Sequence, residues 1–537
     1  MSYIQSILNS LNSRIFRNRR ITTAFVCYLY ILTNSACQRV LVEGNEKMPT
    51  HFSIQVPTEV KTVMRGVPAA DSIKAFIALP GQLAREVDTL NYSFKWGLLP
   101  NDDVLSNMPY LTINDFDKLP VDKNTILLTV KEKSTGIVEY VTTDVFITTP
   151  TREGWVILGE KSGTTQIGML AYTNEGYKKY IDVNADLAKN IAVNGKPVSI
   201  RAVGSDQPYG WSKLQWIGLT TDQEIKMISS MEMQVDPTMS QALTQLLAPS
   251  VSNPIVLEKI GYTNFLASKQ SDIYHFSIYD MTLGYTSGQL MNVNKTSGGS
   301  QIFPASTVNI QSAPGPPENS ASFYGILYDL DNGIFVGIDP YHSVSQYNLS
   351  LQLPFSLKGF QLKAMRNQMG ATGQSDLIFA LLHDSTTKET YLIQFLTNGI
   401  LKDTRKISFT EAEAIVSSRF IEIDYTTGYV IYEKGNAVFA YDPAAGQSFQ
   451  LIDFGNNAIS LLKFVHYNQG SSTLPGRADI YDELFKRLIV CTYDPLNADN
   501  SGTFHLYQTV LGHQPAILET EESGFPKIVD TDFVPIH

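Results

Sequence analysis

Cys37 is the residue whose surroundings indicate the most definite chemistry. It follows a basic stretch at 17–20, an apolar run at 21–32 and the small pair Ser35-Ala36. This order of segments is typical of a secretory signal. In bacterial lipoproteins the cysteine sulfur then receives a diacylglyceryl group and the chain is cut just before the cysteine. Each buried acyl methylene contributes about 0.8 kcal/mol to membrane binding. We therefore predict that Cys37 is lipidated.

Two alternatives stay open at this position. Asn34 stands where leucine is commonest in lipoprotein signals, although Leu32 lies two residues upstream. A transmembrane anchor would need roughly 20 apolar residues, and the run here is shorter. Cleavage without lipidation would leave a soluble periplasmic protein. We assign 1–36 to a signal peptide and 37–51 to a tether, and no later segment is long and apolar enough to cross a bilayer.

The other candidates for chemistry have simpler structural interpretations. Cys491 is the one cysteine after Cys37, and its strand-like apolar run favours a buried, inert thiol over a nucleophile. The eight histidines include no pair at the i, i+4 spacing with which a helix holds zinc. Ser287 lacks the spacing of a nucleophile elbow. We predict no catalytic residue, no metal site and no cofactor.

Two segments resemble ligand-binding loops but are better explained as hairpin turns. The segment 154–163 has glycines at the spacing of a phosphate-binding loop, yet Glu160 precedes its lysine and no helical pattern follows. The segment 329–333 has the composition of a calcium loop, but Pro340 falls where a bidentate glutamate would be needed. We predict β-hairpins at both places.

In the first part of the chain, short runs of alternating apolar and polar residues predict the strands that would hold any site. Runs such as 92–96, 125–130 and 138–141 alternate apolar and polar residues with the period of half-buried strands. Trp96 is most economically a core residue between two sheets. About seven such strands over 52–150 predict an immunoglobulin-like sandwich.

Strand pairs recur along the rest of the chain. A buried strand, a turn closed by Asp, Asn or Gly and a second strand are found near 154–172, 324–338, 377–395 and 420–441, and again after 488. Repeats of this kind over 151–537 predict a β-propeller of about six to eight blades. A helical insert is expected after Asp236, which can cap it, with Pro237 in its first turn. The predicted fold class is therefore all-β.

Charge narrows the range of partners. The formal net charge is −11 at pH 7, and the first 36 residues hold four arginines and no acid, so removing them makes the chain more acidic. Lysine and arginine form no dense patch elsewhere. Nucleic acid is therefore an improbable partner.

Taken together, these segments resemble the PKD-like family of bacterial lipoproteins, named for a domain like the polycystic kidney disease repeat. The resemblance rests on Cys37, on 92–96, on the junction 149–172 with its Gly154-Trp155 pair, and on the end at 524–530. The Gly-Asp-Gly turn of true PKD repeats is missing after Trp96, and no catalytic residues come with the family.

The resemblance implies an outer-membrane lipoprotein, lipid-anchored at the cell surface or on the periplasmic face. Such a protein would serve as an accessory to a Sus-type uptake complex, in which a TonB-dependent channel carries a lipoprotein lid. The ligand would be a nutrient glycan or peptide, and the sequence does not identify the residues that touch it. A propeller enzyme cleaving glycans or peptides and a structural cell-envelope protein are the alternatives.

Overall fold

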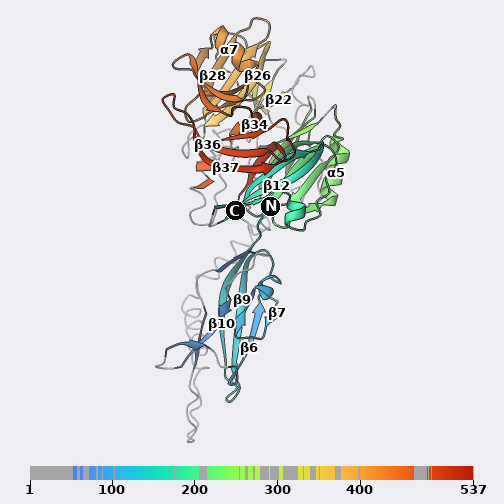
Figure 1. Ribbon diagram of the computed structural model, residues 1–537, viewed down its shortest axis with the longest axis vertical. Coiled ribbons are helices and arrows are strands. Elements are labelled where there is room, and N and C mark those ends of the chain that lie inside the picture. The colour runs from blue at the N-terminus through green and yellow to red at the C-terminus, as the bar shows by residue number, and fades with distance from the viewer. Residues whose placement is uncertain are drawn as a thin grey trace, which may run out of the picture.

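The computed structural model describes most of residues 52–535, and Figure 1 shows their arrangement. Longer gaps lie at 57–60, 65–71, 80–82, 205–214, 261–263, 278–288, 291–301, 306–324, 339–345, 369–376 and 465–479, with shorter ones of one or two residues. The predicted signal peptide, the predicted tether, Cys37 and Ser287 lie outside the described residues. Among the described helices, none has the length and apolar character to cross a membrane.

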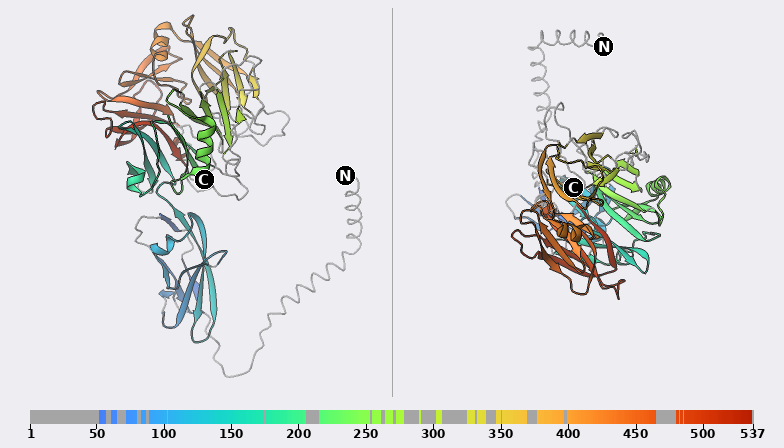
Figure 2. Two further views of the ribbon diagram at one scale, coloured as in Figure 1. Left: turned by 90° about the vertical axis from the view of Figure 1, so that its right-hand side faces the viewer. Right: turned by 90° about the horizontal axis from the view of Figure 1, so that it is seen from above.

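The described chain forms two units that follow one another. The first, blue in Figure 1, extends outward from one side of a ring of sheets formed by the rest of the chain. Figure 2 shows the sheets of the ring arranged around a common centre, with the first unit beside the teal and green segments. The C-terminal end lies close to the place where the two units join.

The first unit contains a five-stranded sheet, a three-stranded sheet and a two-stranded one, with orders β2-β10-β9-β6-β7, β1-β4-β5 and β3-β8. A short helix, α3 (Ile113–Phe116), lies between β8 and β9. Its strands are β1 (Ser53–Gln55), β2 (Lys61–Met64), β3 (Ile73–Lys74), β4 (Phe76–Ala78), β5 (Arg85–Glu86), β6 (Tyr92–Leu98), β7 (Asp103–Ser106), β8 (Tyr110–Leu111), β9 (Asp122–Glu132) and β10 (Val138–Thr148).

The core of this unit is apolar and centres on Trp96. The side chain is fully buried, and its Nε1 donates a hydrogen bond to the carbonyl oxygen of Met108 at 2.8 Å. Ile126 and Leu128 of β9 pack in the same cluster as Ile77 of β4, so residues of two sheets share one core. The prediction that Trp96 is a core residue is confirmed, whereas the immunoglobulin-like or PKD-like assignment of the unit stays a prediction.

The described residues of the second unit form a ring of seven four-stranded antiparallel sheets, the architecture of a β-propeller. The count lies within the predicted six to eight. Strands of the first four blades are β11 (Gly154–Lys161), β12 (Thr164–Thr173), β13 (Gly176–Tyr180), β14 (Pro197–Gly204), β15 (Gln215–Thr221), β16 (Ile225–Ser229), β17 (Gln234–Asp236), β18 (Ile255–Ile260), β19 (Asn264–Lys269), β20 (Asp272–Ser277), β21 (Gln289–Leu290), β22 (Ile302–Ala305), β23 (Gly325–Asp329), β24 (Ile334–Ile338) and β25 (Gln346–Leu349).

The last three blades and the closing strand complete the ring. Their strands are β26 (Phe360–Gln368), β27 (Leu377–Asp384), β28 (Thr390–Leu396), β29 (Leu401–Lys406), β30 (Ile421–Ile423), β31 (Val430–Lys434), β32 (Ala437–Asp442), β33 (Gln447–Asp453), β34 (Ala458–Phe464), β35 (Arg487–Tyr493), β36 (Gly502–Gln508), β37 (Ile517–Phe525) and β38 (Lys527–Val534). Helices α4 (Val183–Asp186), α5 (Pro237–Leu247) and α7 (Phe409–Val416) lie between blades.

Ring closure joins the two ends of the propeller sequence. The first blade has the order β13-β12-β11-β38, so its innermost strand comes from the C-terminus and its other three from the start of the ring. β38 contacts β14 of the second blade and β34 of the last blade. The innermost strands thus surround the centre of the ring, and β38 completes the circle.

Local patterns in the ring follow the sequence closely. The hairpin predicted in 154–163 is β11 followed by β12, and the turn at 329–333 joins β23 to β24. Asp236 caps α5 by accepting a hydrogen bond from the Met239 amide at 2.8 Å, with Pro237 as the first helical residue. These three predictions are confirmed.

Gly154 opens the first strand of the ring in a conformation that only glycine adopts easily. Its φ is +137°, and a Cβ there would lie 2.1 Å from the carbonyl oxygen of Leu170. Trp155, the next residue, is fully buried and packs at 5.0 Å between ring centroids against Phe533 of β38. The Gly154-Trp155 pair therefore marks the point where the chain enters the closing blade.

Four of the five residues between the two units are buried, and the segment is tied to the ring. Thr151 Oγ1 donates to the carbonyl oxygen of Ser230 at 2.9 Å, and Tyr481 donates through its hydroxyl to Glu153 Oε1 at 2.8 Å. The guanidinium of Arg152 lies 4.3 Å from the centroid of the Phe146 ring in β10. This junction has the contacts of packed structure, not those of a free linker.

Candidate functional site

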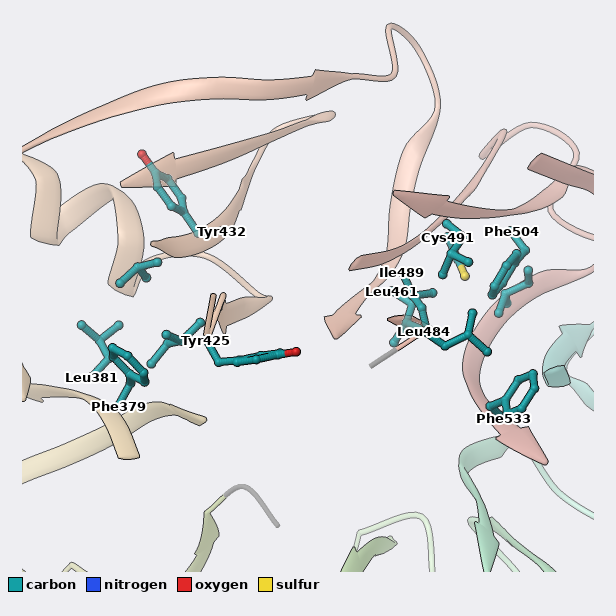
Figure 3. Close-up of a cluster of buried hydrophobic side chains, with 14 of the residues drawn as sticks. Phe379, Leu381, Tyr425, Tyr432, Leu461, Leu484, Ile489, Cys491, Phe504 and Phe533 are labelled. Carbon is teal, nitrogen blue, oxygen red and sulfur yellow. The ribbon is translucent and has the colours of Figure 1, made fainter. Parts of the chain in front are cut away.

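The predicted inert thiol lies inside the largest apolar cluster of the ring. Cys491 in β35 is fully buried, and Figure 3 shows its sulfur among Leu461, Ile489 and Phe504. Burial raises the pKa of this thiol far above its usual range, because the thiolate would lose its hydration. The prediction that Cys491 is buried is confirmed, and that its thiol is inert stays a prediction, which the raised pKa favours. Within the described parts of the chain, no cluster of three or more His, Cys, Asp or Glu side chains could hold a metal.

Charged side chains meet at the centre of the ring, where the closing strand lies. Asp530 of β38 accepts hydrogen bonds from Arg201 of β14 and from Lys463 Nζ of β34, the latter at 2.7 Å. The Ile200 amide donates to the same carboxylate at 3.0 Å, and the Ala202 amide donates to Asp532 Oδ2 at 2.8 Å. The last strand is therefore bonded through its carboxylates to inner strands on both sides.

This central cluster is built for closure, not for binding. The side chains of Asp530, Arg201 and Lys463 are only 8–10% exposed. Burial alone would raise the pKa of Asp530, but the positive charges of Arg201 and Lys463 outweigh burial and hold the pKa below its ordinary value. An ionised carboxylate with every neighbouring cation engaged leaves little for a ligand to contact. We assign the cluster a structural role in closing the ring.

A better candidate for binding is a shallow recess at the seam between the last and first blades. It has a volume of about 350 Å³. We call it the seam recess. Its walls come from the end of β12, from β13, from a helical turn at 480–484 and from the starts of β35 and β37. The lining residues are Tyr172, Tyr177, Ile480, Glu483, Leu484, Arg487 and Glu519.

Two tyrosines form the aromatic part of the seam recess. The Tyr172 and Tyr177 rings meet edge to face, with centroids 5.4 Å apart and an angle of 72°. Trp155 Nε1 donates to the Tyr177 hydroxyl at 3.2 Å, which anchors that ring to the core of the blade. Burial raises the pKa of Tyr177 to about 12, so its hydroxyl stays neutral at physiological pH. Ile480 and Leu484 extend the apolar surface.

The rim of the seam recess is charged but internally paired. Arg487 Nε donates to Glu519 Oε2 at 2.6 Å, and Arg487 Nη1 lies 3.3 Å from Glu483 Oε2. Lys486 Nζ lies 2.6 Å from the other oxygen of Glu483. The Arg487 side chain is only 11% exposed, whereas Glu483 is 54% exposed. Arg487 is therefore held rigidly between two carboxylates that still face solvent.

Two further recesses were compared with the seam recess. One of about 460 Å³ lies beside the junction between the units and is lined by residues of that junction, of β13, of α4 and of the segment that follows α4. Another of about 300 Å³ lies at the end of α7, where Arg419 already forms a bidentate ion pair with Glu433. The first offers one aromatic ring, Tyr180, which is 6% exposed and lies beside Lys178, and the second offers none. The seam recess has two tyrosine rings beside ion-paired polar groups, which is closer to the usual composition of ligand pockets.

Sequence reasoning did not identify any residue of the seam recess. Its side chains come from five elements, and Tyr172 and Arg487 stand at opposite ends of the propeller sequence. The pairing of β38 with β11 brings these ends together. The one local signal was a pair of tyrosines flanking the turn between β12 and β13. That signal cannot be distinguished from core packing without the fold.

Comparison with known proteins gives similarity of low degree. No protein-family model and no curated protein matches the chain. A quinoprotein alcohol dehydrogenase-like protein of Bacteroides thetaiotaomicron is 11% identical with a TM-score of 0.32, over 90% of this chain and 97% of that one. A protein of Lactobacillus plantarum is 12% identical with a TM-score of 0.37, over 71% and 99% of the two chains.

Propeller proteins are also among the similar structures. The WD40 domain of SCAP from fission yeast is 9% identical with a TM-score of 0.28, and the match covers 61% of this chain and 74% of that one. The description of the ring given above rests on its own sheet order and not on these likenesses.

Proposed function

We propose that this chain is an exported, lipid-anchored binding protein that captures an extracellular nutrient, a glycan or a peptide, in the seam recess. The observation that carries the proposal is the composition of that recess. Two tyrosines and two aliphatic side chains form its surface, and an ion-paired arginine forms its rim. Such a surface can hold a ligand, and none of its residues is arranged as a nucleophile with an activating base.

The lipid anchor and the partners belong to the same proposal. A lipid on Cys37 would tether the chain to the outer membrane, and the first unit would carry the ring away from the bilayer. The resemblance to PKD-like lipoproteins supports an accessory role beside a TonB-dependent channel and its lid. The packed junction at 149–153 fits this role, because a ligand site held at a fixed distance from the anchor could be presented to a channel.

Ligand capture without turnover is the first test. The purified full-length chain in detergent is incubated with libraries of neutral and acidic oligosaccharides and of short peptides, and bound and free fractions are examined by mass spectrometry. We expect retained ligands of unchanged mass. Cleaved products that scale with protein concentration would instead favour the enzyme alternative.

Membrane attachment and partners are tested separately. Cells are labelled with a palmitate analogue, and the label should appear on the wild type and be lost from Cys37→Ser; equal labelling of both would exclude lipidation at this residue. Pull-down from detergent extracts should then recover a channel and a lid protein. Recovery of other envelope components alone, with no ligand found in the first test, would favour the structural alternative.

A further inference from the structure

We infer that the seam recess binds a neutral sugar ring, so that the captured nutrient is an uncharged glycan and not a peptide or an acidic polysaccharide. This inference rests on the proposed binding function and goes further by naming the ligand class and the residues that select it. It is carried by three properties of the recess: its charge balance, the hydrogen-bonding capacity left on its rim, and the shape of its aromatic surface.

The charge balance of the rim argues against an ionic ligand. Glu483 and Glu519 supply two negative charges, and Lys486 and Arg487 supply two positive ones, all within one connected set of ion pairs. A charged ligand would have to break one of these pairs to gain its own partner, and the exchange would bring little net energy. A neutral ligand can be bound with every pair intact.

The rim still has hydrogen bonds to offer. Of the two carboxylate oxygens of Glu519, Oε2 accepts a hydrogen bond from Arg487, and no donor to Oε1 is found among the described residues. The Glu519 side chain is 30% exposed. Its Oε1 can therefore accept from a ligand hydroxyl, while guanidinium N–H groups can donate to one. A sugar carries hydroxyls that donate and accept at once, and bonds to charged groups are the stronger kind. An aliphatic side chain would use none of these groups, and a peptide backbone offers only one N–H donor and one carbonyl acceptor per residue, whereas one sugar ring carries several hydroxyls.

The aromatic surface fits the other half of a sugar. A pyranose ring has hydroxyls around its edge and C–H groups on its faces, so it needs an apolar surface beside a polar rim. Tyr172 and Tyr177 provide rigid rings with few rotatable bonds, and Ile480 and Leu484 continue the surface below them. Because the recess is shallow and lies at the outer seam, a ring within a long polymer could rest in it without threading an end into a pocket.

The recess is also a product of ring closure. Tyr172 and Tyr177 belong to the first blade, while Glu483, Arg487 and Glu519 belong to the last. A ligand that contacts both sides would bind only the closed ring and would therefore stabilise it against unfolding by mass action. Binding can thus be measured as an increase in the melting temperature of the ring as well as by the heat released or absorbed on titration.

The test uses titration calorimetry on the purified full-length chain in detergent. The ligands are neutral hexasaccharides of glucose, mannose, galactose or xylose, an acidic galacturonate hexasaccharide, and uncharged hexapeptides. We expect at least one neutral hexasaccharide to bind, and Tyr172→Ala to weaken that binding about tenfold. Tyr172→Phe keeps the ring and should retain the affinity. Glu519→Gln should weaken binding several-fold, because a neutral amide oxygen replaces the charged acceptor and the ion pair that holds Arg487 is lost.

The matched control is Tyr140→Ala, which removes a tyrosine 63% exposed on β10, away from the ring. It should bind like the wild type, and the melting temperature of each variant shows that it is folded. Equal sugar affinity of the wild type and Tyr172→Ala would overturn the site while leaving glycan binding intact. Tighter binding of the acidic hexasaccharide, or peptide binding lost in Tyr172→Ala, would overturn the ligand class. No binding by any probe would remove the proposed function as well.

Discussion

The two units of the chain bury different kinds of side chain. In the first unit the core around Trp96 is apolar, and its ion pairs, such as Lys123 with Asp144, lie at the surface. In the ring, by contrast, Asp530 meets Arg201 and Lys463 in a centre where their side chains are only 8–10% exposed. Both units are β-structures of similar strand composition, so strand propensity does not explain the difference.

The difference follows from the distance in sequence that each unit must bridge. The longest strands of the first unit, β9 and β10, form a hairpin and find each other locally. The closing strand of the ring must find its neighbour across 330 residues, as in the bond from the Ile200 amide to Asp530. Apolar packing tolerates alternative arrangements, whereas a buried charge with directional partners accepts only one register. We therefore expect the charges to specify closure at some cost in stability.

The largest effect is expected when the central carboxylate is removed. Asp530→Ala leaves two cations buried without their shared partner and should destabilise the ring by about 3–5 kcal/mol. Urea unfolding and, separately, scanning calorimetry should show a lower stability for the transition of the ring. The transition of the first unit should be unchanged. A loss below about 1 kcal/mol would show that the centre is hydrated and would weaken the contrast between the units.

A smaller effect, confined to the other unit, is expected from Trp96→Phe. The shorter ring cannot donate to the Met108 carbonyl, and the lost bond should cost about 1–3 kcal/mol. Differential scanning calorimetry should show a lower melting temperature only for the transition assigned to the first unit. A simultaneous shift of the ring would mean that the packed junction makes the two units unfold together.

A smaller difference between the units is expected in the dependence of their stability on pH. Burial lowers the pKa of His505 in β36, although its bond to the Val490 carbonyl and the nearby Glu521 act in the opposite direction. Because the unfolded histidine binds a proton near pH 6.5 and the folded one only at lower pH, stability is full above about pH 6.5 and declines as pH falls through the folded pKa. His505→Gln should flatten this decline for the ring, measured as the urea midpoint between pH 7.5 and 5. An unchanged slope would contradict the assignment.

The smallest effect is expected at the outer surface of the same seam. The Asp499 carboxylate accepts from the Ser162 amide at 2.7 Å and also from its hydroxyl, linking the last and first blades in an exposed position. Asp499→Asn should leave the melting temperature of the ring nearly unchanged, because water replaces such contacts readily. It serves as the matched control for Asp530→Ala. A large loss at Asp499 would locate closure at the rim and not at the centre.

The sequence could predict features that are set within a few neighbouring residues. It could not predict the features that arise only when the ring closes. The strand pairs, the core role of Trp96, the cap at Asp236 and the buried Cys491 all follow from patterns within a few residues. The pairing of β38 with β11 has no such pattern, so the count of seven blades could be bounded but not fixed. Asp530 is one of 52 acidic residues, and nothing nearby marks it as buried. The seam recess could not be found for the same reason.

The place of β38 has a consequence for the way the molecule is made. Synthesis proceeds from the amino end. The first unit and the second to seventh blades can therefore fold while the first blade still lacks its innermost strand, β38. During that interval β11 presents a row of unsatisfied amide and carbonyl groups, a template for joining another chain. A nascent chain is therefore most vulnerable to aggregation just before β38 is synthesised. A stop codon that removed only the final strand would be as harmful as one that deleted a whole blade.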